Sequence, residues 1–120
     1  MKYLLMIYSD PAAADACSES DLEALTRDHA AFDRRLAESG ELVGSEGLAH
    51  PTNAKTVRVL DGVPTVTDGP FAAAQEHLAG YYVIDCENLE RAIELASGLP
   101  GAGFSAVELR PVMAHAGLEM

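Results

Sequence analysis

The chain has 120 residues, and its 19 acidic against 8 basic side chains give a net charge of −11. This length fits a single domain, residues 1–120, with one core. A strongly acidic surface without a basic patch repels phosphate backbones and anionic lipid headgroups, which argues against binding to nucleic acid or membrane.

The first third of the chain predicts a strand and a helix. Residues 3–8 form a short apolar run, typical of a strand that is buried on both faces. An alanine-rich loop is expected over residues 11–17. Ser20 and Glu23 then have the spacing of a capping box, and Gly40 is suited to end the helix. The side chains expected on the inner face of this helix are Leu22, Leu25, His29, Phe32 and Leu36.

The middle of the chain predicts a β-hairpin. Residues 41–48 read as extended, and residues 55–60 alternate polar and apolar side chains, as a strand with one wet face does. Asp61-Gly62 is a hairpin signal, and residues 64–67 would form the return strand. Residues 67–71 predict a turn, while residues 72–79 could form a helical turn or lead directly into the next strand.

The last third predicts a strand, a helix and a final strand. Residues 81–86 are apolar on both faces. Asn88 is suited to cap a helix that ends near Gly98 and Pro100. The side chains expected to face inward from this helix are Leu89, Ala92, Ile93 and Ala96. Residues 106–112 predict the last strand.

This order of elements predicts an α+β fold of the ferredoxin-like, split βαβ type, with an extra hairpin and two helices on one face of the sheet. The strands expected at the centre of that sheet, residues 3–8 and 81–86, are apolar on both faces. No further helix remains to cover the second face. We therefore expect a second copy of the chain to cover it, giving a homodimer of the dimeric α+β barrel type.

Several motifs together resemble a known family. The segment Asp68-Gly69-Pro70-Phe71 and the strand after it, Gly40-Glu41-Leu42, Pro100 and residues 107–112 are similar to the DGPF branch of the YCII-related family. This resemblance implies a ferredoxin-like α+β fold that is usually dimeric. It also implies a group in which some members look like small-molecule lyases or dehydrochlorinases with a His–Asp pair, while some DGPF members are encoded beside sigma factors or fused to them.

The resemblance makes His29 and Asp68 candidate catalytic residues. His29 occupies the position of the family's histidine, and histidine suits proton transfer near neutral pH. The alternative is that His29 is an inert helix residue and that Asp68 stabilises its turn by accepting from the amides of Gly69 or Phe71. We also expect Gly69 to have a backbone conformation unfavourable for other residues, and Phe71 to be a buried anchor.

Glu76 and Arg110 are candidate ligand-binding residues. Glu76 retains a family position, and the alternative is a solvated acid. Arg110 could hold a carboxylate ligand, or it could pair with an acid such as Glu108. The chain departs from the family at Ala73, where Glu is usual, and at Gln75, where Lys is usual. If those residues act in relatives, the function of this protein is altered or lost.

No cofactor and no metal site are expected. His50, His77 and His115 lack metal-ligand spacing, and no phosphate-binding loop occurs. Cys17 and Cys86 match no disulfide, zinc or redox pattern, which predicts a cytoplasmic protein with reduced thiols. The expected partners are a second copy and a small-molecule ligand. Three functions remain open: acid–base chemistry on a small organic substrate, a noncatalytic ligand-binding or regulatory module, and a plain dimeric interaction domain.

Overall fold

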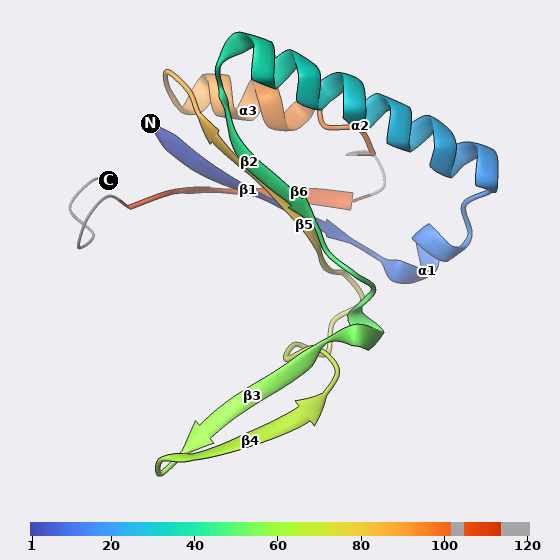
Figure 1. Cartoon of the computed structure of the whole chain (residues 1–120), viewed down its shortest axis with the longest axis vertical. Coiled ribbons are helices and arrows are strands. Elements are labelled where there is room, and N and C mark those ends of the chain that lie inside the picture. Colours follow the sequence, from blue (N-terminus) through green and yellow to red (C-terminus); the bar gives the residue numbers. More distant parts are fainter. Residues whose placement is uncertain (102–104, 114–120) are drawn as a thin grey trace.

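Four strands form one antiparallel sheet in the order β2-β5-β1-β6. They are β1 (Lys2–Ser9), β2 (Leu42–Gly47), β5 (His77–Asp85) and β6 (Ser105–Pro111). The computed structural model in Figure 1 describes residues 1–101 and 105–113. The order is the one that a split βαβ connection requires, and it confirms the α+β class. The two strands with unbroken apolar runs, β1 and β5, lie in the centre as predicted.

Helix α2 (Glu19–Ser39) is capped by Ser18, two residues before the predicted cap Ser20. The Oγ of Ser18 accepts from the amide of Asp21 at 3.1 Å, and the Asp21 carboxylate accepts from the amide of Ser18 at 3.3 Å. The box on Ser20 and Glu23 is therefore wrong, because an aspartate at the third helical position completes the same pair of bonds two residues earlier. The helix ends at Gly40 with φ of 77°, as predicted.

A short helix, α1 (Pro11–Asp15), replaces the loop expected over residues 11–17. Asp10 caps it by accepting from the amide of Ala12 at 2.9 Å. Pro11 at the first helical position has a φ already suited to a helix, and its missing N–H costs nothing there. The same Asp10-Pro11 pair that ends β1 thus starts a helix.

Both long helices, α2 and α3 (Leu89–Ser97), lie over one face of the sheet (Figure 1). Asn88 caps α3 as predicted, accepting from the amide of Arg91 at 2.9 Å. Leu89 and Ile93, however, are about half exposed, which corrects their predicted inward orientation. The buried stripe of α3 is made by small alanines that let the helix approach the sheet. The core consists of Tyr3, Leu5, Phe32, Leu36, Tyr82, Ile84, Cys86, Ala92, Ala96 and Leu99.

The hairpin of β3 (Lys55–Leu60) and β4 (Val63–Asp68) forms a separate two-stranded sheet. A 3₁₀ turn, η1 (Pro51–Asn53), precedes it, and the hairpin extends away from the main sheet (Figure 1). Asp61 and Gly62 have φ of 50° and 79°, the positive values that a type I′ hairpin turn requires. The hairpin predicted from the sequence is confirmed.

The turn after the hairpin is built on Gly69 rather than on Phe71. Gly69 has φ of 94°, as predicted, and its amide donates to the carbonyl of Ala54 at 2.8 Å. Phe71 is 72% exposed, so the prediction of a buried anchor is wrong. Phe71 is exposed because the turn follows a hairpin that stands away from the core. The guanidinium of Arg58 lies over its ring, 4.8 Å from the ring centroid. Residues 71–76 contain no helix, and β5 begins at His77.

Two apolar surfaces of the chain lack cover within the described residues. One face of the hairpin carries Val57, Val59 and Val66, each at least 60% exposed. The sheet face opposite the helices includes the half-buried side chains of Leu4 and Met6. The radius of gyration is 16.4 Å, whereas a compact domain of this length has about 14 Å. In the described part of the chain, no helix is long and apolar enough to cross a membrane.

Candidate functional site

A tyrosine hydroxyl joins a histidine to a carboxylate where α2 packs on β5. His29 and Asp33 are four residues apart on α2, a spacing that places them on the same side of the helix. The Nδ1 of His29 lies 3.3 Å from the hydroxyl oxygen of Tyr82 in β5. That hydroxyl donates to the carboxylate of Asp33. The three side chains therefore form one hydrogen-bonded series, which we call the His29–Tyr82–Asp33 relay.

The middle member of this relay is held by the core. Tyr82 is 5% exposed, and its ring meets the edge of Phe32 with centroids 5.5 Å apart and planes at 86°. Burial raises the pKa of Tyr82 well above its usual range, and the hydrogen bond to the negative Asp33 raises it further. Tyr82 therefore keeps its proton throughout the physiological range.

The arrangement fixes which nitrogen of His29 is basic. Because the only hydroxyl proton of Tyr82 goes to Asp33, its oxygen is left to accept, and Nδ1 of His29 must donate. In the neutral imidazole the proton then resides on Nδ1, and Nε2 carries the free lone pair. His29 is only half-buried, so part of the ring remains open to solvent. This is the chemistry of an oriented general base.

Tyr82 and Asp33 were not among the site residues predicted from the sequence. One signal was available, because a tyrosine on a strand buried on both faces needs a partner for its hydroxyl. A second was the i, i+4 spacing of His29 and Asp33. Neither signal says that α2 crosses β5 at the level where these three side chains meet, since that depends on packing.

Asp68 lies at the end of β4, with its side chain 87% exposed, and pairs with Lys55 at 2.5 Å. The predicted bond to the amide of Gly69 is wrong, because that amide donates to Ala54. Among the described residues, no hydrogen bond joins Asp68 to His29, and the two side chains have different partners. Contact between them, within one chain or between two subunits, stays a prediction.

The predicted ligand-binding residues lie on exposed surface. Arg110 pairs with Glu108 at 2.6 Å, which is the alternative that the sequence offered. Glu76 is exposed and makes no side-chain hydrogen bond within the described residues. Gln75, which stands where the family usually has lysine, donates from Nε2 to the carboxylate of Asp10 at 2.8 Å. Within residues 1–101 and 105–113, no cluster of three or more metal-binding side chains occurs.

Comparison with known proteins decides the family. A family model described as the YCII-related domain matches residues 1–116. The chain belongs to the YCII-related family. It is also 37% identical over 114 residues to "Uncharacterized protein R00369" of Rhizobium meliloti (strain 1021), an alignment that covers 93% of this chain and 92% of the relative. The likeness therefore extends over nearly the whole length of both proteins.

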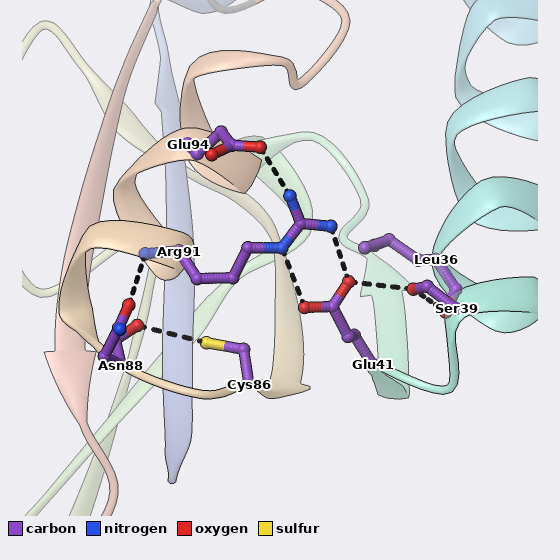
Figure 2. Close-up of polar contacts among 7 residues, drawn as sticks. All are labelled: Leu36, Ser39, Glu41, Cys86, Asn88, Arg91 and Glu94. Carbon is purple, nitrogen blue, oxygen red and sulfur yellow. Dashed lines mark hydrogen bonds and ion pairs between the residues drawn. The ribbon is translucent and has the colours of Figure 1, made fainter.

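This YCII-related chain has a second polar cluster, around Arg91 of α3 (Figure 2). Its Nε and Nη2 donate to the two carboxylate oxygens of Glu41 at 2.9 and 2.8 Å, and its Nη1 donates to Glu94 at 2.5 Å. Ser39 also donates to Glu41, at 2.8 Å. Each of the three guanidinium nitrogens thus donates to one of these two carboxylates. The cluster joins the α2–β2 connection to α3 and has a structural role.

The bond to Arg91 sets the acid sensitivity of this cluster. Hydrogen bonds from Arg91 lower the pKa of Glu41, although burial opposes the shift. The stabilisation that ionised Glu41 gives the folded state is complete above 4.5, the pKa of this carboxyl in the unfolded chain. It is lost as the pH falls through the lower pKa that Glu41 has in the folded protein. We expect Glu41→Gln to reduce the free energy of unfolding at pH 7, with a difference from wild type that shrinks below about pH 4.5.

Urea unfolding across this pH range measures the effect, and Glu94→Gln is the matched control. Glu94 contacts the same guanidinium, but its side chain is 70% exposed, so little change is expected. Equal losses for the two variants at pH 7 would contradict the role given to Glu41.

Proposed function

We propose that this YCII-related protein performs acid–base chemistry on a small organic substrate, with Nε2 of His29 as the atom that takes or gives the proton. One observation carries the proposal: the hydroxyl of Tyr82 lies between Nδ1 of His29 and the carboxylate of Asp33. A histidine with one nitrogen fixed by a hydrogen bond presents the other nitrogen as a base of defined position. The carboxylate partner of this histidine is thus Asp33, reached through Tyr82.

Each residue of the relay has a separate task. Nε2 of neutral His29 accepts a proton from the substrate, and the ring becomes an imidazolium. The bond from Nδ1–H to Tyr82 strengthens as that charge develops, and the negative Asp33 stabilises it from behind the tyrosine. Tyr82 does not pass its own proton on, because its raised pKa opposes ionisation. His29 is therefore the catalytic residue, while Tyr82 and Asp33 position it.

Exchange of substrate protons in D₂O tests this proposal. A panel of small carbonyl acids and phenols is incubated with the protein, and ¹H NMR follows deuterium incorporation or elimination. We expect protein-dependent turnover of at least one class, slower by about 10²- to 10⁴-fold in His29→Gln, as is typical when a general base is lost. The proposal fails if no member of the panel reacts, or if the variant reacts as fast as wild type.

The alternative function is a noncatalytic ligand-binding or regulatory module, with the link to sigma-factor signalling as one form of it. Binding of panel members without any turnover, unchanged in His29→Gln, would favour it. The assignment to the DGPF branch, on residues 68–71, likewise stays a prediction.

We also propose that the protein works as a homodimer in which a second copy covers the apolar hairpin face. The support is physical. A two-stranded hairpin alone is marginally stable in water, and Val57, Val59 and Val66 are mostly exposed in the single chain. The central strands add a second apolar surface. Two copies related by a two-fold axis would bury both surfaces of both chains.

A further inference from the structure

We propose that a pocket at the base of the hairpin is a binding site for a small organic acid. The pocket has a volume of about 320 Å³, within the range of small-ligand sites. It lies where the segment between β2 and β3 meets Pro70 and the first residues of β5. No member of the His29–Tyr82–Asp33 relay lines it, so the site is separate from the one proposed above.

The polar side chains of this pocket are two histidines and an asparagine. The Nδ1 of His50 accepts from the amide of Thr52 at 3.2 Å. In the neutral ring the proton is therefore on Nε2, which is available to donate. His77 is half-buried, and within the described residues its ring has no hydrogen-bond partner. Asn53, which donates to the carbonyl of His50 at 3.3 Å, completes the polar part.

The charge of the lining decides the class of ligand. The described lining comprises nine residues, and none of them is acidic, in a chain with 19 acidic side chains. Donors in a lining that itself holds no carboxylate suit a carboxylate ligand and disfavour a cation. The other walls are apolar and include Leu48, Pro70 and Leu78. A small ligand with an apolar skeleton and one carboxylate matches this lining.

The pocket and the relay can be tested separately because they lie apart along β5. His77 begins the strand and Tyr82 lies five residues further on, which is roughly 16 Å at the usual rise of about 3.3 Å per residue. The proposal for the pocket does not rest on the proposed function of His29. Binding in the pocket and chemistry at the relay can therefore fail independently.

Titration of the ¹⁵N-labelled protein with benzoate tests the proposal, with benzyl alcohol and benzylamine as matched probes. We expect benzoate to shift the amide signals of residues 48–50, 52–54 and 77–78, with benzyl alcohol weaker by about tenfold or more and benzylamine without effect. His50→Gln and His77→Gln should each weaken benzoate binding by about tenfold or more, whereas His29→Gln should leave these shifts in place.

Three results would overturn the proposal. The first is the absence of saturable shifts in the pocket at millimolar benzoate. The second is equal binding of benzylamine, which would mean that the lining does not select an anion. The third is a benzoate affinity that both pocket variants retain. Shifts confined to residues around His29 would place acid binding at the relay instead, and would equally overturn the pocket.

Discussion

Val66→Glu is expected to convert the proposed homodimer into a monomer with the chain mass of 12.7 kDa. Val66 lies directly opposite Val57 on the apolar face of the hairpin and is 61% exposed in the single chain. A glutamate there is harmless to a monomer but would be buried without a partner twice in each dimer. We expect a cost of about 3 kcal/mol or more over both copies, which raises the dissociation constant by at least about 100-fold.

Thr65→Glu is the matched control for this prediction. Thr65 precedes Val66 in β4, lies on the opposite face of the hairpin and is paired with Arg58. The same added charge should therefore leave the dimer intact. Light scattering after size exclusion at micromolar concentration measures both variants. A monomeric wild type, or equal masses for the two variants, would contradict the assigned interface.

Asp33→Ala is expected to slow turnover by about 10- to 100-fold, although in the proposed mechanism Asp33 only positions His29. Once the carboxylate is gone, the Tyr82 hydroxyl is free to donate to Nδ1 of His29. The ring then carries its proton on Nε2 and can no longer act as a base there. Losses of this size are typical when a group that orients a metal-binding histidine is removed, and we expect a similar loss here.

Asp33→Asn separates this effect from a general loss of structure. The amide oxygen of asparagine can still accept from Tyr82, so the histidine should keep its tautomer, and most activity should remain. If the alanine and asparagine variants lose the same activity and share one tautomer, the directional argument for the relay is wrong.

The sheet was well predicted from the sequence because the patterns that define its strands are local. Unbroken apolar runs identified β1 and β5 as central, and Asp61-Gly62 defined the hairpin turn. The failures were of another kind. The sequence predicts the capping box at Ser20, whereas Ser18 forms it, since serine, aspartate and glutamate alternate there and several registers satisfy the same rule. Phe71 is exposed because the hairpin before it extends away from the core, and no local sequence pattern predicts this direction.

The candidate site was only partly predictable. His29 was identified by its position in the family pattern, but its partners were not. The resemblance of residues 68–71 to the DGPF segment made Asp68 a candidate catalytic residue. In the structure its carboxylate pairs with Lys55 at the base of the hairpin. Tyr82 and Asp33 meet His29 only because α2 packs across β5 at that level. Long-range packing of this kind has no counterpart in local sequence spacing.

The most direct test of the relay is the tautomer of His29 in the wild-type protein. Long-range ¹H–¹⁵N correlation at a pH where the imidazole is neutral distinguishes a proton on Nδ1 from a proton on Nε2. Among the four histidines of the chain, the signals of His29 are identified by their loss in His29→Gln. The account predicts that His29 carries its proton on Nδ1, because Tyr82 donates to Asp33 and accepts from this nitrogen. A neutral His29 with its proton on Nε2 would contradict it.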